Sequence, residues 1–233
     1  MKTAVRKPEA LQVLDHGLVQ LIDSMGDDLA IVNAAKASFD TESTEYGRAE
    51  AAILRFLMRE EHGSPFEAVV MKFKLRMPIF LARQYVKHRI ASWSEQSGRY
   101  DELQPLFYVP EVEDVRSQVG KPGAYTFEPV SQNVADEFRC QLLAANAQAW
   151  EAYRCALDAG VAKELARLSL PVNLYTNVVW TINARSLFNV LRLRVDAHAQ
   201  REAQFYAQAM EALAREVIPD AVAAFVAAER PKP

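Results

Sequence analysis

Residues 70–77 read VMKFKLRM, and this stretch decides the fold class. Its apolar side chains alternate one by one with basic side chains: Met71, Phe73, Leu75 and Met77 against Lys72, Lys74 and Arg76. Strict alternation predicts a strand with one face in the core and the other in water or in contact with anions.

The flanking sequence predicts mainly helices around this strand. Pro78 suits the first position of a helix over 78–89, and Asp27 can cap a helix over 28–37. Apolar residues at helical spacing and the punctuating Gly63, Gly160 and Pro219 indicate further helices over 46–61, 131–159, 161–169, 184–217 and after 219. Two more strands are expected over 11–22, broken at Gly17, and over 174–182. We therefore expect an α+β fold, mostly helical with a small antiparallel sheet.

The composition favours one cytoplasmic domain. The chain has 233 residues, half of them hydrophobic, which fits a single domain over 1–233. A net charge of −3 argues against a nucleic-acid polymer as partner. We see no signal peptide and no apolar run near the roughly 18 residues that cross a membrane.

The cysteines and histidines indicate neither a disulfide nor a metal site. Cys140 and Cys155 lie in one predicted helix, about 22 Å apart, too far to pair. The four histidines are scattered along the chain, so we expect no metal. Residues 101–130 hold four prolines and two glycines, and we expect a mobile loop or arm there.

Residues 87–100, KHRIASWSEQSGRY, gather polar groups of many kinds. Gln84, Lys87 and His88 are expected on one helical face. A Ser-Gly turn brings backbone N–H groups close to an anion, and Arg99 could hold a phosphate with its planar fork. Glu95 could accept from a sugar hydroxyl or a base N–H. The mixture suits a nucleoside monophosphate, although a solvated helix end with a polar turn explains the composition equally well.

Two further clusters are less specific. In NARSLFNVLRLR, residues 183–194, Arg185 and Asn189 share a face, whereas Arg194 lies on the opposite side of the helix. The helix would then be contacted on both sides, or be a surface helix with long arginines. In HGSPFE, residues 62–67, Ser64 and Glu67 fit a capping box with Pro65 at the first helical position. Patterns of hydrolases, P-loops and Rossmann loops are absent from the sequence.

KHRIASWSEQSGRY resembles the signature of the flavin-dependent thymidylate synthases, RHR followed by seven residues and Ser. His88, Arg89 and Ser97 match this signature. Four other stretches resemble further blocks of the family and occur in the family's order, over about 27–206: HGSPFE, ELQPLFYVP, LPVNLYT and NARSLFNVLRLR. The resemblance implies the fold of this family, a homotetramer with FAD at subunit junctions. It implies reductive methylation of dUMP at C5, with methylenetetrahydrofolate as carbon donor, NADPH as reductant and no cysteine nucleophile.

The resemblance also implies the contacts of both ligands. The flavin contacts would be Ser38, His62, Ser64, Glu67, Lys87, His88, Arg89, Ile90, Glu95, Asn183, Arg185 and Asn189. The dUMP contacts would be Gln84, Lys87, Glu95, Ser97, Gly98, Arg99, Arg167, Leu193 and Arg194. Arg194 would face the uracil and favour ionisation at N3, and Ser97 would bind and position the substrate without covalent attack.

Three positions depart from the family pattern. Lys87 replaces the first Arg of the signature, Ser94 stands where Asn is usual, and Ala68 stands where many members have His. Lysine keeps the charge and loses the bidentate fork. A UMP C5-methylase of the kind found in nucleoside-antibiotic pathways therefore stays an alternative. A flavin or nucleotide binder without catalysis is a second alternative.

Overall fold

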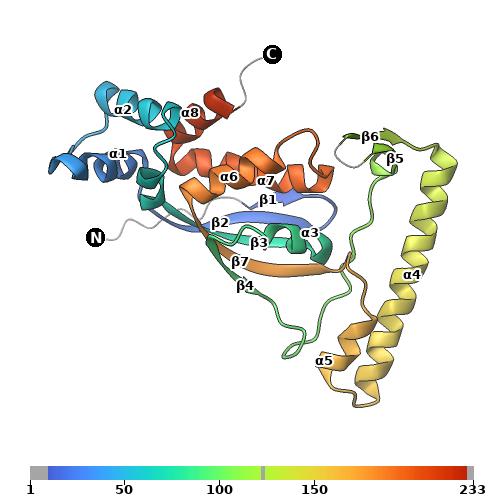
Figure 1. Cartoon of the computed structure of the whole chain (residues 1–233). Helices are drawn as coiled ribbons and strands as arrows, with labels where there is room; N and C mark the ends of the chain where they lie inside the picture. The colour runs from blue at the N-terminus through green and yellow to red at the C-terminus, as the bar shows by residue number, and fades with distance from the viewer. Residues whose placement is uncertain (1–9, 122–123, 230–233) are drawn as a thin grey trace.

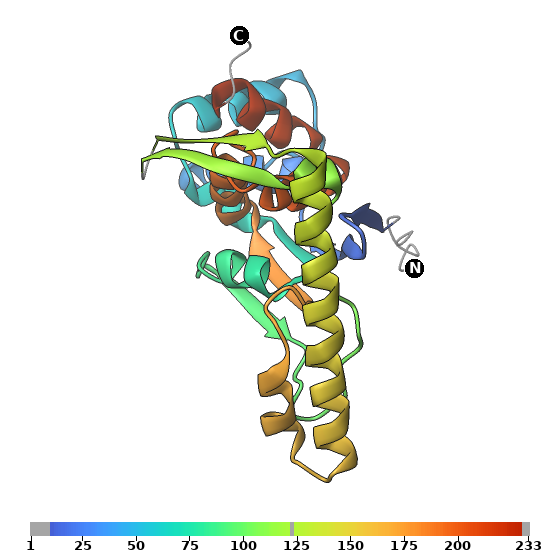
Figure 2. The same ribbon diagram turned by 90° about the vertical axis from the view of Figure 1, so that its right-hand side faces the viewer.

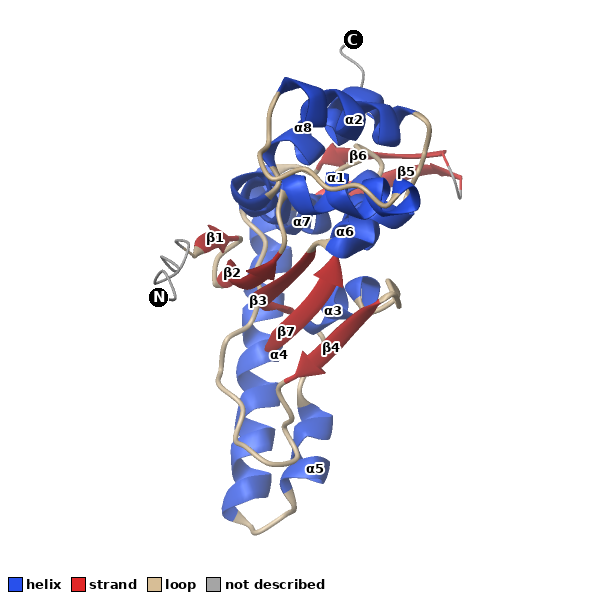
Figure 3. Cartoon of the chain, turned by 90° about the vertical axis from the view of Figure 1, so that its left-hand side faces the viewer, coloured by secondary structure: helices blue, strands red, loops and turns tan. Residues whose placement is uncertain are grey.

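The computed structural model describes residues 10–121 and 124–229. Its centre is an antiparallel sheet of five strands in the order β1-β2-β3-β7-β4 (Figures 1 and 3). The strands are β1 Leu11–Val13, β2 Gly17–Met25, β3 Val70–Pro78, β7 Tyr175–Asn183 and β4 Ala91–Glu95. Strands far apart in the sequence thus lie side by side, with β3 in the middle of the sheet.

The alternation in 70–77 produces the expected strand. Its four apolar side chains are buried, and Lys74 is exposed. Phe73 lies opposite Leu21 of β2 and Trp180 of β7. The central strand is therefore held by pairing on both edges and by burial of one face.

The described part of the core also contains six α-helices. They are α1 Asp28–Lys36, α2 Arg48–Arg59, α3 Ile79–Tyr85, α6 Ala184–Arg194, α7 Arg201–Val217 and α8 Pro219–Glu229. Helix α7 contacts β1 and β2, and α2 contacts α8. The Asp27 side chain accepts a hydrogen bond from the Ala30 N–H and caps α1 as expected. The prediction of an α+β fold with an antiparallel sheet is confirmed, with about half of the chain helical.

A long arm projects from this core. Helix α4 Gln132–Asp158 runs down one side to α5 Lys163–Ala166, and a hairpin crosses above the sheet (Figure 2). The hairpin consists of β5 Arg116–Lys121 and β6 Ala124–Pro129. Residues 101–130, expected to be a loop or arm, thus contain a paired hairpin. Gly120, with φ 107°, lies next to the end of β5 and Pro129 is the last residue of β6, so neither residue interrupts the pairing. The mobility expected for this segment stays a prediction.

Two helix predictions were too long. The helix over 78–89 ends at Tyr85, and residues 91–95, expected in a loop, form β4 because they fill the open edge of β7. The helix over 184–217 is interrupted between Arg194 and Arg201, where the Asp196 carboxylate accepts from the His198 N–H and turns the chain. Within the described ranges, no helix combines the length and apolar character needed to span a bilayer.

Replacing Phe73 by Ala tests the central position of β3. We expect the free energy of unfolding to fall by about 3–5 kcal/mol, because a buried ring leaves a cavity between two paired strands. Lys74→Ala, on the exposed face of the same strand, should change it by less than about 0.5 kcal/mol. Chemical denaturation followed by circular dichroism compares the two variants. Equal losses would contradict the assigned faces.

Candidate functional site: a cationic cavity beside α6

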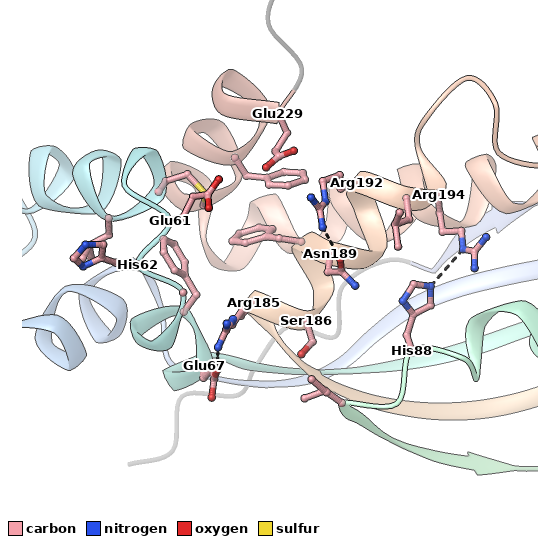
Figure 4. Close-up of a pocket in the computed structure, with 18 of the residues that line it drawn as sticks. Glu61, His62, Glu67, His88, Arg185, Ser186, Asn189, Arg192, Arg194 and Glu229 are labelled. Carbon is pink, nitrogen blue, oxygen red and sulfur yellow. Dashed lines mark hydrogen bonds and ion pairs between the residues drawn. The ribbon is translucent and has the colours of Figure 1, made fainter. Parts of the chain in front are cut away.

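A cavity of about 860 Å³ opens beside α6. Three segments supply most of its wall: residues 57–67 at the end of α2 and beyond, residues 87–90 after α3, and residues 185–194 of α6. Phe225 and Glu229 of α8 also line the cavity, and Figure 4 shows Glu229 on the α8 side of it. The edge strand β4 begins directly after residues 87–90, so the sheet determines where these residues enter the cavity.

The capping box expected in HGSPFE is wrong. Gly63, not Ser64, is the N-cap of a short 3-10 helix over Ser64–Ala68, and Glu67 accepts a hydrogen bond from Arg185 Nη1 at 2.5 Å. A Cβ atom at Gly63 would lie 2.6 Å from Arg185 Nε, so the bare glycine lets the arginine lie against the backbone. The ion pair between two distant segments thus replaces local capping. Helix α2 also ends earlier than Gly63, at Arg59, and Glu61 just beyond it has a φ of 56°.

Helix α6 contributes its whole length to the cavity. The Asn183 side chain accepts from the Ser186 N–H and caps the helix, so it is a cap rather than part of the wall. Arg185 lies at one end of the cavity beside Glu67, and Arg194 lies at the other beside His88 (Figure 4). The two arginines, expected to contact different ligands on opposite sides, therefore line one continuous cavity.

Arg194 is held by the end of α3. Its Nε donates to His88 Nε2 at 3.3 Å, and its Nη2 donates to the Gln84 main-chain oxygen at 3.4 Å. Arginine nitrogens only donate, so His88 must be neutral and accept through Nε2. Burial first, and the nearby guanidinium second, lower the pKa of His88 below its ordinary 6.5. The arrangement is therefore complete at neutral pH and lost when acid protonates His88.

The face expected for Gln84 and His88 differs from the structure. Because α3 ends at Tyr85, His88 lies beyond the helix and not one turn above Gln84. The Gln84 side chain donates from Nε2 to Gln200 Oε1 at 2.6 Å, away from the cavity wall. Its backbone carbonyl, rather than its amide, thus connects α3 to Arg194.

The cavity carries an excess of positive charge. Five cations line it with three carboxylates: Lys87, Arg89, Arg185, Arg192 and Arg194 against Glu61, Glu67 and Glu229. Among the described residues only Arg185 of these five has a carboxylate oxygen within 4.0 Å. A concave surface with four cations that lack a carboxylate partner in the described ranges attracts anions, and phosphate groups are the anions that arginine forks bind best.

A second polar cluster lies at the far end of β4. Arg99 Nε pairs with Glu164 Oε2 at 3.2 Å, and the main-chain N–H of Arg99 donates to Ser97 Oγ at 3.4 Å. Arg167 lies beside Gly98, since a Cβ atom at Gly98 would be 3.3 Å from Arg167 Cδ. Strand β4 separates this cluster from the cavity by about 13 Å of extended chain. In Figure 1 the chain after β4 descends towards α5, away from α6.

The predicted contacts therefore divide into groups. The flavin set lines the cavity with His62, Glu67, Lys87, His88, Arg89, Ile90, Arg185 and Asn189. The dUMP set lines it with Lys87, Leu193 and Arg194. Outside the wall are Ser38, Ser64, Gln84, Glu95, Ser97, Gly98, Arg99, Arg167 and Asn183. Glu95 accepts from Thr176 Oγ1 and from Trp93 Nε1, which holds it on the sheet.

Several wall residues were not predicted. Arg192 lies three residues after Asn189 and donates to it, and that spacing is a signal the sequence contained. Phe225 and Glu229 had no such signal, because only the packing of α8 near α6, where Phe225 stacks on Phe188, brings them to the cavity. Phe188 lies on α6 directly before the predicted Asn189. In residues 10–121 and 124–229, no three His, Cys, Asp or Glu side chains gather as a metal site.

Comparison with known proteins places this geometry in a family context. The family model described as thymidylate synthase complementing protein matches residues 20–220. A flavin-dependent thymidylate synthase of Treponema denticola is 42% identical over 216 residues, covering 92% of this chain and 80% of the relative. One of Thermus thermophilus is 43% identical over 221 residues, covering 94% of this chain and 78% of the relative. The crystal structure of a UMP/dUMP methylase, PolB of Streptomyces cacaoi bound with 5-Br dUMP, aligns with a TM-score of 0.86 at 37% identity, covering 96% of this chain and 100% of that chain.

The contact between Arg194 and His88 predicts a coupled titration. The pKa of His88 should lie below 6.5 in the wild type and rise in Arg194→Ala, because one of its two causes is removed. It should stay below 6.5, since burial is the larger cause. NMR of labelled imidazoles measures this, with the other three histidines as internal references. An unchanged pKa in the variant would contradict the contact.

Proposed function

The chain belongs to the thymidylate synthase complementing protein family, that of the flavin-dependent thymidylate synthases, and from this premise we propose that it methylates dUMP at C5 to give dTMP. The cofactor is FAD. Methylenetetrahydrofolate supplies the carbon and NADPH the reducing equivalents. A cytoplasmic location is part of the same proposal.

The observation that carries the proposal is the cationic cavity. Its volume of about 860 Å³ is in the range of small-molecule sites, and its wall joins two family blocks, HGSPFE and NARSLFNVLRLR, with the start of the signature. Unpaired cations suit the diphosphate of FAD, and the exposed Ile90 and Leu193 offer apolar surface for its rings. When bound, the reduced flavin supplies the hydride of the reaction.

Arg194 is the residue that we assign to the uracil. A fixed cation facing the ring favours ionisation at N3, and the resulting negative charge makes C5 a better nucleophile. His88 and the Gln84 carbonyl already hold the guanidinium in place, so little reorganisation is needed when the substrate binds. Cys140 and Cys155 both lie on α4, outside the wall of the cavity, which agrees with a reaction that uses no cysteine nucleophile.

The nucleotide contacts support a site shared between subunits. Ser97, Gly98, Arg99 and Arg167 form a donor-rich cluster that suits a phosphate, but β4 holds it away from Arg194 of the same chain. A homotetramer that apposes the cavity of one subunit and this cluster of another would bring the predicted dUMP contacts together. Ser97 binds and positions the substrate in this proposal.

UMP is the second candidate substrate. The structural neighbour PolB is described as a UMP/dUMP methylase, and Lys87 at the cavity wall departs from the family's arginine. Turnover of dUMP and of UMP with methylenetetrahydrofolate and NADPH separates the two. We expect dUMP to be preferred. A clear preference for UMP would overturn the substrate assignment, and yellow protein that turns over neither would identify a binder without catalysis.

Arg194→Ala should lower the turnover of dUMP by about 10²–10³-fold or more while the fold stays intact, because one preorganised charge is removed. Arg83→Ala, an exposed arginine on α3 outside the cavity wall, is the matched control and should keep full activity. Circular dichroism monitors the fold of both. Normal turnover of Arg194→Ala would rule out the role assigned to this side chain.

Lys87→Arg should keep or raise the activity, since arginine restores a bidentate donor at the same charge. Steady-state kinetics with dUMP and with UMP test this variant. A complete loss of activity would instead show that lysine has a specialised role at this position.

A further inference from the structure

Arg192 is a cation of the cavity to which the proposed contacts give no role. It lies in the last turn of α6 and lines the cavity together with Glu61 and Glu229. No carboxylate oxygen of the described chain lies within 4.0 Å of its guanidinium, although three carboxylates line the same cavity. Its hydrogen bond goes instead to Asn189, from Nη2 to Oδ1 at 2.9 Å.

This bond decides how the Asn189 amide is oriented. The arginine can only donate, so the oxygen of the amide must face it and the Nδ2 group must point the other way. Asn189 Nδ2 has no hydrogen-bond partner within the described part of the chain. Arg192 and Asn189 thus present their remaining N–H donors at the wall of one cavity, on either side of the Asn189 oxygen, and the guanidinium adds a positive charge.

Adjacent donors that carry a positive charge suit a phosphate oxygen. We propose that Arg192 and Asn189 together form a phosphate-binding subsite, occupied by the diphosphate of the flavin dinucleotide. This inference deepens the proposed function and rests on it. The nucleotide substrate is the weaker source of the phosphate, because Ser97, Arg99 and Arg167 already offer donors at the other end of β4.

A simpler role for Arg192 is to stabilise the helix. A cation in the last turn of a helix interacts favourably with the partial negative charge there, and an anion bound at that end must overcome the same partial charge. Arg59 provides the comparison, because it is the basic residue in the last turn of α2 and does not line the cavity. A purely helical role predicts similar behaviour of variants at the two positions.

Flavin binding by the purified apoprotein tests the inference. Fluorescence titrations compare FAD with riboflavin, which shares the isoalloxazine ring and lacks phosphate, for wild type, Arg192→Ala, Arg192→Lys and Arg59→Ala. Arg192→Ala should raise the Kd for FAD about tenfold, the scale of one charge-assisted contact, and change the Kd for riboflavin by less than about twofold. Arg192→Lys should keep most of the affinity for FAD, and Arg59→Ala should match the wild type.

Salt provides a second measurement. The affinity of the wild type for FAD should fall more steeply with ionic strength than that of Arg192→Ala, because one cation–phosphate contact is absent in the variant. A separate titration with dUMP should give the same Kd in both proteins.

Four results would overturn the inference. Equal FAD affinity of wild type and Arg192→Ala overturns this inference and leaves the proposed function in place. So does an equal loss of affinity for FAD and riboflavin, or a loss confined to dUMP. Absence of FAD binding by the wild-type protein overturns the proposed function together with this inference.

Discussion

The pairing of β4 with β7 is the constraint on which the rest of the site depends. Trp93 lies directly opposite Trp180, with ring centroids 6.0 Å apart in an edge-to-face arrangement. This geometry stabilises the pair of strands beyond the contribution of ring burial. Because Trp180 is buried in the core, β4 is attached to a rigid strand over its whole length. Residues 87–90, before β4, therefore lie at the cavity, and residues 97–99, after it, lie at the opposite end of the strand.

This separation gives the two ends different electrostatics. At the cavity, four cations have no carboxylate partner among the described residues, whereas Arg99 in the other cluster pairs with Glu164. Unpaired like charges repel one another and destabilise a ligand-free protein, so an anion bound in the cavity stabilises the folded chain. Two of these four cations are oriented by neutral acceptors before any ligand binds: Arg194 by the 84–88 segment and Arg192 by the Asn189 amide oxygen.

Local sequence patterns predicted those helices and strands that depend mainly on neighbouring residues in the sequence. The alternation of 70–77 produced β3, Asp27 capped α1, and Gly160 follows α4 with φ 79°. Strand β4 was missed because its five residues need the distant β7 to become a strand. The capping box failed for the same reason, since the partner of Glu67 is Arg185, 118 residues away. The family motifs predicted many wall residues, but the division of these residues by β4 and the bond from Arg192 to Asn189 follow only from the packing.

We propose that one active site combines the cavity of one subunit with the 97–99 cluster of another. Two variants, each inactive alone, test it directly: Arg194→Ala damages the cavity and Arg99→Ala damages the cluster. Co-expressed with different tags and purified as mixed oligomers, they should recover about a quarter of wild-type turnover, because random assembly pairs an intact cavity with an intact cluster in about one site in four. Mixed oligomers as inactive as the single variants would contradict the account.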